Sequence, residues 1–376
     1  MTRADRTLRL LVAGVGLAIV LLALAELGAR LFAPPPPAPY VHHPLLGPGW
    51  APNYSFERLS IDDPPVVFTL QVNPLGFRGK RMRTLDKPKG AYRVFFLGAS
   101  TVENALLPEE RTFPGRVDDA LDDRFKGAPP VEVANTGVAG TGIEFTTGML
   151  TDRVLPLEPD LCIFLVGHNV YFETLHAEWD PRAAPQPEPP PTFKDWLSGA
   201  SRLVALLDAR KRAKTAREDN KSGWYQGHRE DRHRLPFTPA KLDILRGIPY
   251  FKQCLRRLAV ICRDAGTACA FMTQPALYKD SMKPEEEAAL LGVVTKDPEQ
   301  NLDTATIKRG MDAYNQAVRD VAKEQGAILI DTANAVPRDL VHFVDDVHLT
   351  SKGNEEEAKA VVDSILGGDG KLPRVP

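Results

Sequence analysis

Five short apolar runs recur along the chain, and each gives way to glycine or to polar residues. They cover residues 93–97, 131–134, 161–166, 268–273 and 327–330. Runs of this length, rich in branched and aromatic side chains, are typical of strands that are buried on both faces. Between the runs, apolar positions recur at the spacing of amphipathic helices. The pattern therefore predicts alternating strands and helices.

The helical patterns have the length of ordinary surface helices. They cover residues 113–125, 143–155, 251–263, 311–325 and 355–366. Strands that alternate with helices form parallel sheets, because each helix carries the chain back to the start of the next strand. We therefore expect an α/β domain of the flavodoxin-like kind, with three α/β/α layers. Its five strands should be parallel and lie in the order 2-1-3-4-5.

Other regions precede or interrupt this pattern. We divide the chain into an N-terminal segment (1–33), a proline-rich spacer with an extension that packs on the core (34–90), and the α/β domain (91–376). The extension should contain one strand, at residues 66–72. An insertion at about 173–240 separates the third strand from the fourth and could form a cap over a cleft.

The N-terminal segment contains an uncharged apolar run at residues 10–25, preceded by three arginines. Spanning a bilayer takes roughly 20 apolar residues, so this run is a marginal transmembrane helix. The basic flank predicts that the N-terminus stays in the cytoplasm. The chain would then be a single-pass protein of the bacterial inner membrane with its main domain in the periplasm. The small residues at 23–25 also fit a signal-peptidase site, so a cleaved signal peptide is the alternative.

Charge and cysteine content narrow the possible partners. The formal net charge is −2, so the overall balance does not attract nucleic acid. Residues 203–217 form a helical pattern with a basic end, which fits either a solvated helix face or contact with anionic lipid or polysaccharide. The four cysteines include no CxxC pair, so we expect no structural zinc and no cofactor. Cys262 and Cys269 could form a bridge in an exported domain or could both remain buried thiols.

Four loops with catalytic potential are each predicted to follow a strand. They contain Ser100, the glycines of residues 135–140, Asn169, and the pair Asp345 and His348. Since ligands of open α/β sheets bind beyond the carboxyl ends of the strands, we expect these loops to meet. A histidine can take the hydroxyl proton of a serine, and a carboxylate can hold the imidazole in the required tautomer. Ser100 alone could merely cap a turn. The convergence of four loops favours a nucleophile.

In order, these loops resemble the motif blocks of the SGNH (GDSL-like) hydrolase family, in its membrane-anchored bacterial type. The blocks are Gly98-Ala99-Ser100, the glycine of Val138-Ala139-Gly140, Gly167-His168-Asn169, and Asp345-x-x-His348. The resemblance extends from Tyr92 to Leu366 and implies the SGNH hydrolase fold. Two departures bear on the subfamily and not on the chemistry. Ala99 replaces the usual Asp before the serine, and Val170 replaces the Asp that often follows the Asn.

The resemblance also implies what each residue does. Ser100 would be the nucleophile, His348 the general base and Asp345 its orienting partner. The oxyanion hole would consist of the backbone N–H groups of Ser100 and Gly140 and the side-chain amide of Asn169.

Three further residues are candidates for contact with substrate. His168 and Tyr171 flank Asn169 and could line the cleft, although His168 could equally be a structural donor. Residues 73–79 resemble a segment that precedes the serine block in many membrane-anchored bacterial members. We expect this segment to pack beside the core, with direct substrate binding by Arg78 as the alternative.

A site of this kind points to acyl transfer. We expect a serine esterase that removes O-acyl groups from cell-envelope carbohydrate or lipid. If a sugar hydroxyl takes the place of water, the same site makes an O-acyltransferase that acts on envelope polysaccharide. A non-catalytic envelope-assembly protein on the same scaffold is a further alternative, against which the intact Ser, His, Asp and Asn argue.

Overall fold

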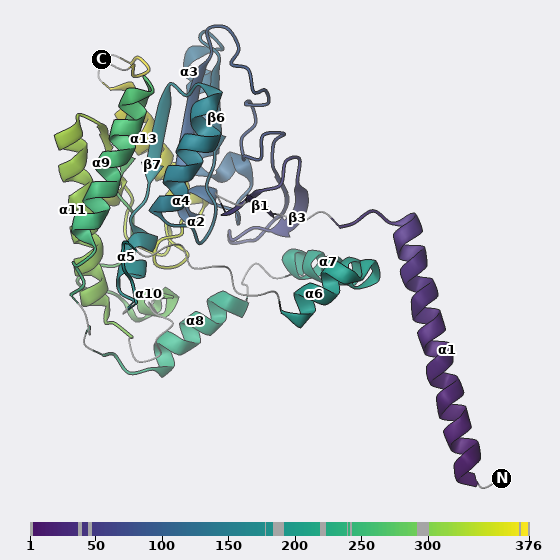
Figure 1. Ribbon diagram of the computed structural model, residues 1–376. Helices are drawn as coiled ribbons and strands as arrows, with labels where there is room; N and C mark the ends of the chain where they lie inside the picture. The colour runs from purple at the N-terminus through teal and green to yellow at the C-terminus, as the bar shows by residue number, and fades with distance from the viewer. Residues whose placement is uncertain are drawn as a thin grey trace. The chain divides into compact units, whose positions relative to one another are not determined.

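The computed structural model describes residues 3–36, 40–43, 47–176, 178–182, 192–218, 223–238, 240, 243–291, 301–367 and 370–374. The chain forms two compact units, Met1–Ala38 with Ala184–Glu218 and Pro39–Ala183 with Asp219–Pro376. The insertion expected at about 173–240 is therefore divided between the two units. The larger unit holds the α/β domain (Figure 1).

A five-stranded sheet forms the centre of the larger unit. Its strands are β5 (Tyr92–Gly98), β6 (Val131–Asn135), β7 (Leu161–Leu165), β8 (Ala268–Met272) and β9 (Ile328–Ile330). They lie in the order β6-β5-β7-β8-β9, and all neighbouring pairs are parallel. The predicted α/β fold and strand order are confirmed. Each strand begins and ends within one residue of its expected bounds.

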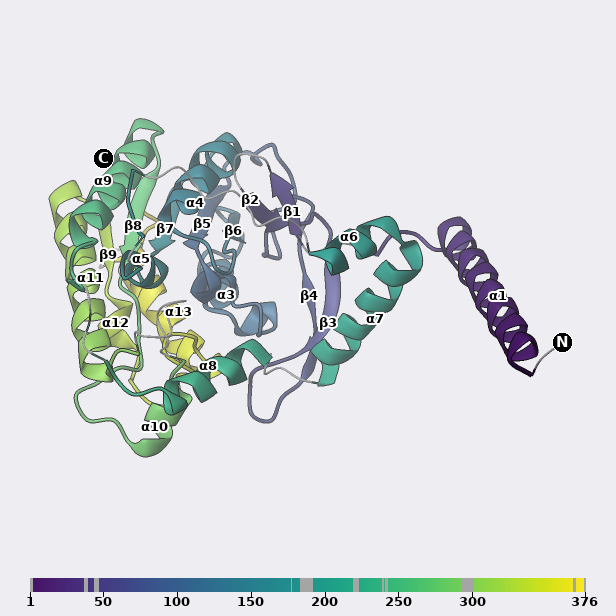
Figure 2. The ribbon, with the colours of Figure 1, turned by 60° about the horizontal axis from the view of Figure 1, so that its bottom comes forward.

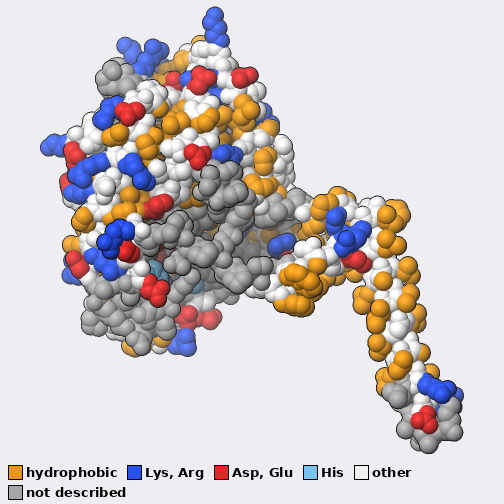
Figure 3. All heavy atoms as spheres, in the orientation of Figure 1, with side chains coloured by type: hydrophobic (Ala, Val, Ile, Leu, Met, Phe, Trp, Pro, Cys, Tyr) orange, Lys and Arg blue, Asp and Glu red, His pale blue; other side chains and the backbone are white. Residues whose placement is uncertain are grey.

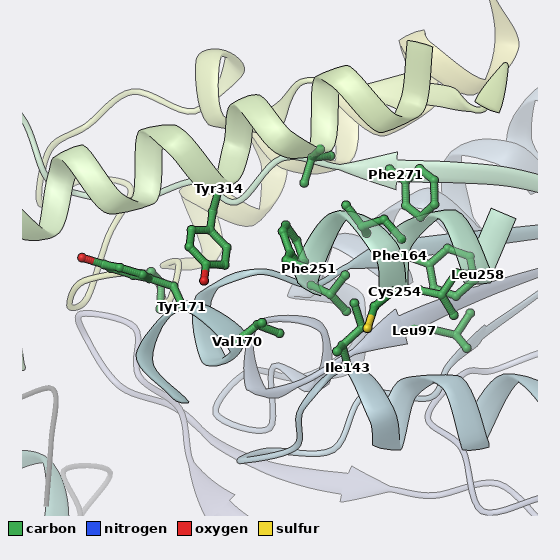
Figure 4. Packing of buried hydrophobic residues seen from close by; sticks show 14 of the residues in the cluster. Leu97, Ile143, Phe164, Val170, Tyr171, Phe251, Cys254, Leu258, Phe271 and Tyr314 are labelled. Atoms are coloured by element: carbon green, nitrogen blue, oxygen red, sulfur yellow. The ribbon is translucent and has the colours of Figure 1, made fainter. Parts of the chain in front are cut away.

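The sheet is covered by helices on both faces. These helices are α3 (Phe113–Phe125) and α13 (Ser351–Leu366) on one face, and α4 (Ile143–Gly148), α9 (Ile248–Asp264) and α11 (Thr304–Gln325) on the other. Alternate side chains of a strand point to opposite faces, and the two cores follow this rule. Phe95 and Leu97 of β5 pack in the core with α9 and α11, part of which is shown in Figure 4. Val94 and Phe96 pack against α3 and α13.

Several helices extend beyond their predicted bounds. α11 begins at Thr304 because the side chain of Asp303 accepts a hydrogen bond from the backbone of Thr306. α13 begins at Ser351 because Thr350 caps it in the same way. The helix expected at 143–155 starts as α4 and continues through a π-helical turn (Met149–Val154) and a 3₁₀ turn (Leu155–Leu157).

The N-terminal extension consists of two hairpins. β1 (Tyr40–His43) pairs with β2 (Gly47–Trp50), and β3 (Ser55–Leu59) pairs with β4 (Val67–Gln71), both antiparallel. β4 matches the strand expected at 66–72. β3 is an additional strand that the pattern does not predict, because Phe56 and Leu59 are its only apolar residues. The hairpins bury Trp50 and Leu70 in a small aromatic core of their own.

The second half of the insertion belongs to the larger unit. It contains α8 (Gly223–Arg234), whose Arg232 is only 2% exposed. The Arg232 guanidinium donates hydrogen bonds to the backbone oxygen of Leu302 and to the hydroxyl of Thr304, at the start of α11. The first half contains α6 (Phe193–Ala200) and α7 (Arg202–Glu218), which belong to the smaller unit with α1 (Arg3–Phe32).

Three thiols meet in the core of the larger unit. Cys162 on β7 and Cys269 on β8 are neighbours across the sheet. Cys262 on α9 shares hydrogen bonds with both of them. All four cysteines of the chain are free.

Candidate active site

Ser100 lies directly beyond the carboxyl end of β5. It is the first residue of α2 (Ser100–Glu103), so it begins a four-residue helix and does not lie in an open loop as expected. The close approach of β7 requires glycine at position 98, because a Cβ there would lie 2.4 Å from the backbone oxygen of Leu165. Gly98 thus allows the chain to turn sharply from the sheet into α2.

Two buried polar side chains hold α2 in place. The guanidinium of Arg78, which is 1% exposed, donates hydrogen bonds to the backbone oxygens of Glu103 (2.6 Å), Asn104 (2.8 Å) and Leu107 (2.9 Å). The side-chain amide of Asn135, at the end of β6, donates to the backbone oxygen of Val102 at 2.7 Å. Arg78 therefore supports the turn beneath Ser100 from within the protein, which excludes the alternative in which it contacts substrate directly.

Asp345 and His348 come from a loop that reaches Ser100 from the other end of the chain. A short bridge between Phe343 and Leu349 closes the loop. The expectation that it directly follows a strand is wrong, because the short helix α12 (Thr332–Ala335) and a further turn intervene after β9. The Asp345 carboxylate, which is fully buried, accepts hydrogen bonds from the backbone N–H groups of Val347 (3.0 Å) and His348 (2.9 Å).

The three side chains form a continuous hydrogen-bonded chain. Nδ1 of His348 lies 2.9 Å from Oδ2 and 3.0 Å from Oδ1 of Asp345, and Nε2 lies 2.9 Å from Oγ of Ser100. A histidine in this arrangement can accept the serine proton while the carboxylate stabilises the imidazolium.

The electrostatics of the pair follow from its geometry. Burial is the largest single influence on His348 and lowers its pKa, but the charge and hydrogen bond of Asp345, with smaller contributions from Asp346 and Glu103, together leave this pKa above its usual value. Burial raises the pKa of Asp345, but His348 and the two backbone donors lower it below its usual value. Asp346 faces elsewhere, because its carboxylate accepts hydrogen bonds from the hydroxyl of Tyr278 (2.7 Å) and the backbone of Leu291 (2.6 Å).

Asn169 approaches Ser100 from the loop after β7, on α5 (His168–Thr174). Its amide nitrogen donates to the backbone oxygen of Thr141 at 2.8 Å, which leaves its second N–H available. Its amide oxygen lies 3.3 Å from Nδ1 of His168. Burial lowers the pKa of His168 to about 4, so the ring is neutral and can donate to Asn169. The contact favours the structural role for His168 over direct substrate binding.

Two other predicted residues have different environments. Gly140, in the loop after β6, is exposed and has φ +75°, a conformation that favours glycine. Tyr171 is fully buried and packs against Tyr314 in the core shown in Figure 4. The expectation that Tyr171 lines the cleft is therefore wrong. It follows Asn169 on α5 by two residues, which turns it away from Ser100 and into the protein.

Ser100 borders two cavities of different size. The smaller, of about 10 Å³, is also bordered by Asn169, Thr141, Gly142, His168 and Gln274. The larger, of about 200 Å³, is also bordered by His348, Glu103, Tyr40, Trp50 and Arg58. His348 borders the larger cavity and not the smaller one.

Glu103, which follows Ser100 by three residues, is a site residue that the sequence pattern did not predict. Glu103 is 3% exposed. Its carboxyl group lies 3.3 Å from the hydroxyl of Tyr40 and accepts a hydrogen bond from the backbone of Ala139, next to Gly140. Burial raises the pKa of Glu103 to about 7. The spacing itself was the available signal, because a side chain one helical turn after a nucleophile lies on the same face of the helix.

Within the described ranges, no group of His, Cys, Asp and Glu side chains could hold a metal ion. The fold and the Ser–His–Asp geometry are those of an α/β serine acylhydrolase. The sequence model of the GDSL-like lipase/acylhydrolase family matches residues 96–356, which is well over half of the chain. The protein belongs to this family.

Several solved structures are similar to this chain. A variant of Axe2, an acetyl xylan esterase from Geobacillus stearothermophilus, is 15% identical with a TM-score of 0.41, over 75% of this chain and 97% of that one. LAE5, an α/β hydrolase from the metagenome of Lake Arreo, is 13% identical with a TM-score of 0.42, over 73% and 94% of the two chains. The acetyl xylan esterase AlAXEase is 15% identical with a TM-score of 0.40, over 73% and 99%. No curated protein matches the sequence.

Proposed function

We propose that the protein is a serine esterase that removes short O-acyl groups from hydroxyl-rich alcohols such as carbohydrates. The division of space around Ser100 carries this proposal. In an ester, the acyl chain and the alcohol extend from the carbonyl carbon in different directions, so the site needs a separate space for each. The two cavities that meet at Ser100 provide such volumes and differ in size.

The reaction begins when His348 takes the hydroxyl proton and Oγ of Ser100 attacks the acyl carbonyl carbon. Negative charge develops on the carbonyl oxygen, where the second N–H of Asn169 and the backbone N–H groups of Ser100 and Gly140 stabilise it. His348 then gives its proton to the alcohol oxygen as the ester bond breaks. Water then attacks the acyl-enzyme as His348 takes its proton. When the bond from the acyl carbon to Oγ breaks, His348 returns this proton to Oγ, which restores Ser100 and releases the acid.

The direction of proton transfer assigns the two cavities. The leaving alcohol must lie beside Nε2 of His348 because it receives the proton from there. His348 borders the larger cavity, so this cavity holds the alcohol. The smaller cavity, beside Asn169, then holds the acyl chain, and its volume admits a group about as large as one water molecule. The methyl group of an acetyl ester fits this limit, whereas a long fatty acyl chain does not.

The lining of the larger cavity favours a carbohydrate over a lipid alcohol. Tyr40, Arg58, Glu103 and Asn104 all border it and supply both hydrogen-bond donors and acceptors. An alkyl chain in this cavity would displace water from these polar groups without offering them hydrogen bonds, which is costly. A sugar ring presents several hydroxyl groups that can pair with them.

We further propose that α1 anchors the enzyme in a membrane, so that the substrate is material of the cell envelope. α1 is continuous from Arg3 to Phe32 and is long and apolar enough to cross a bilayer. Its apolar side chains are exposed along its length (Figure 3). A cleaved signal sequence passes the same test of length and composition. Retention of the chain in membranes after an alkaline carbonate wash measures the anchoring.

The function is tested by covalent labelling and by hydrolysis. A fluorophosphonate probe should label the full chain, and p-nitrophenyl acetate should be cleaved far faster than the octanoate. Ser100→Ala should abolish both labelling and cleavage, because it removes the attacking oxygen. Ser364→Ala, a substitution on α13, is the matched control and should change neither.

Two results would count against the proposal. Labelling or acetate release that persists in Ser100→Ala would show that Ser100 is not the nucleophile. Transfer of the acetyl group to an added sugar, with little free acetate, would make the protein an acyltransferase.

A further inference from the structure

The smaller unit joins the apolar helix α1 to a distant part of the chain. Its two other helices, α6 and α7, form what we call the helical pair. The carboxylate of Glu26, on α1, accepts hydrogen bonds from the backbone N–H groups of Arg202 (2.8 Å) and Leu203 (2.9 Å) and from the hydroxyl of Ser201 (2.8 Å). These donors form the start of α7, so Glu26 binds the N-terminus of that helix.

Two further contacts connect the same ends. The guanidinium of Arg30 donates to the backbone oxygen of Ala200 at 2.6 Å, and the guanidinium of Arg202 donates to the backbone oxygen of Ala33 at 2.9 Å. The contacts therefore cover the last two turns of α1, from Glu26 to Ala33. A carboxylate is stabilised at a helix N-terminus by the unpaired N–H groups and the helix dipole. Glu26 is thus a specific contact and not an isolated charge in an apolar helix.

The position of Glu26 defines the level at which the helical pair is attached. The 16 residues before it, from Leu10 to Ala25, are uncharged, and Glu26 is the first charged residue after them. A charge at the centre of a bilayer is costly, so Glu26 marks where α1 leaves the hydrocarbon region. α7 leaves this end of α1 sideways and does not run back along it (Figures 1 and 2). This course places the helical pair at the level of the lipid headgroups.

The surface of the helical pair fits this environment. Phe193 and Trp196 on α6 are 75% and 59% exposed, and their rings stack with centroids 5.7 Å apart. Leu207 on α7 is 58% exposed. Large exposed apolar side chains close to polar ones are typical of helices that lie in a membrane interface, and tryptophan is enriched at that depth.

The remaining part of α7 is basic. Arg210, Lys211 and Arg212 follow one another along its exposed surface. Near a membrane that contains anionic lipids, each such residue adds to the electrostatic attraction. The aromatic residues of α6 and the basic residues of α7 therefore complement the two chemical layers of a membrane surface.

We propose that the helical pair is a membrane-surface element, in which Phe193 and Trp196 insert between lipids and the basic part of α7 binds anionic headgroups. The proposal rests on the proposed anchoring by α1. The pair would give the enzyme a second attachment to the bilayer from a segment 160 residues away from the first, counted from Phe193 back to Ala33.

The test uses tryptophan fluorescence of the full chain in lipid nanodiscs. The difference between wild type and Trp196→Phe isolates the emission of Trp196. This difference spectrum should lose most of its intensity when the acyl chains carry bromine, a short-range quencher, near the headgroups. Trp179→Phe is the matched control, because Trp179 packs on Tyr250 in the larger unit, and its difference spectrum should not change.

A second arm tests the basic residues. Replacing Arg210, Lys211 and Arg212 together by Gln should weaken quenching of Trp196 in discs that contain phosphatidylglycerol and leave it unchanged in discs of phosphatidylcholine alone. Quenching of Trp196 equal to that of Trp179, in a chain that has entered the discs, would overturn the proposal. Failure of the chain to enter the discs at all would instead refute the proposal that α1 anchors the protein in a membrane.

Discussion

The two cavities that border Ser100, here called the narrow and the wide side of the site, are formed by different segments of the chain. The narrow side, assigned to the acyl group, is built by the loops after β6 and β7, within the segment that matches the family. The wide side, assigned to the alcohol, takes Tyr40, Trp50 and Arg58 from the N-terminal hairpins, which lie outside that segment. On the proposed assignment, the chemistry shared with the family and the selectivity for the alcohol reside in different parts of the sequence. Substitutions on each side should therefore change different kinetic parameters.

The largest effect is expected at the centre that both sides share. Asp345→Asn should lower kcat by about 10³–10⁴-fold, because an amide can donate to Nδ1 of His348 and favour the wrong tautomer. Since Asp345 holds the pKa of His348 above its usual value, its loss should also move the acid limb of the pH–rate profile to lower pH. Steady-state kinetics across pH measures both changes.

Asp346→Asn is the matched control for this substitution. It weakens the hydrogen bonds to Tyr278 and Leu291, so it should cost about 1–2 kcal/mol of stability while kcat stays within a few-fold of wild type. If Asp346→Asn were crippling and Asp345→Asn were not, the assignment of Asp345 as the orienting carboxylate would have to be abandoned.

The next effect is confined to the narrow side. Asn169→Ala should lower kcat by about 10²–10³-fold with a smaller change in KM, because it removes a donor that acts on the oxyanion. The loss should be the same for acetate esters of different alcohols. Asn334→Ala, on the exposed surface of α12, serves as the control. A loss that varied strongly with the alcohol would contradict the separation of the two sides.

The smallest kinetic effect is expected on the wide side. Glu103→Gln should lower kcat only a few-fold with p-nitrophenyl acetate and raise KM more for an acetylated disaccharide, since Glu103 borders the alcohol cavity. The negative charge of Glu103 raises the pKa of His348, so the substitution should move the acid limb slightly to lower pH. Equal losses of kcat/KM with p-nitrophenyl acetate and with the acetylated disaccharide would indicate that Glu103 does not contact the alcohol and only positions the backbone of Ala139.

The pH dependence of folding stability gives an independent measure of the pKa of Glu103. Burial raises the pKa of Glu103 from 4.5 to about 7, so its contribution to folding is full below pH 4.5 and is lost as pH rises through 7. The Glu103→Gln variant does not lose stability in this way, because glutamine does not ionise. Its stability relative to wild type should therefore increase by about 1–3 kcal/mol between pH 4.5 and 8, as measured by urea unfolding.

The strands and their order could be predicted because each strand is buried on both faces. Phe95 and Phe96 serve opposite cores, so the whole run at 93–97 is apolar and stands out from its surroundings. The positions of Ser100 and Asn169 follow from the same regularity, since parallel strands bring their carboxyl ends together. His348 lies in a loop that α12 separates from β9, so the rule does not account for its position. The sheet is thus the part of the fold whose sequence pattern is least ambiguous.

The parts that could not be predicted depend on contacts between distant residues. The sequence predicts that residues 73–79 pack beside the core, but it does not predict that Arg78 binds the carbonyl groups after Ser100. Tyr171 is two residues from Asn169, yet its direction is decided by packing against Tyr314. The insertion is divided between the two units because the first residues of α7 bind Glu26 on α1. Local sequence patterns do not predict this long-range contact.

The three clustered thiols have a consequence for biosynthesis. Cys162, Cys262 and Cys269 come from three different elements. Cys162 and Cys262 are buried in the folded state, and Cys269 is half-buried. A chain exported to the periplasm enters an oxidising compartment before these thiols are covered. With Cys254, the four cysteines allow three fully paired connectivities, and each one would cross-link a chain whose native state has none. If the domain is exported, as proposed, burial must precede oxidation, and the yield of active enzyme should depend on the relative rates of folding and of thiol oxidation in that compartment.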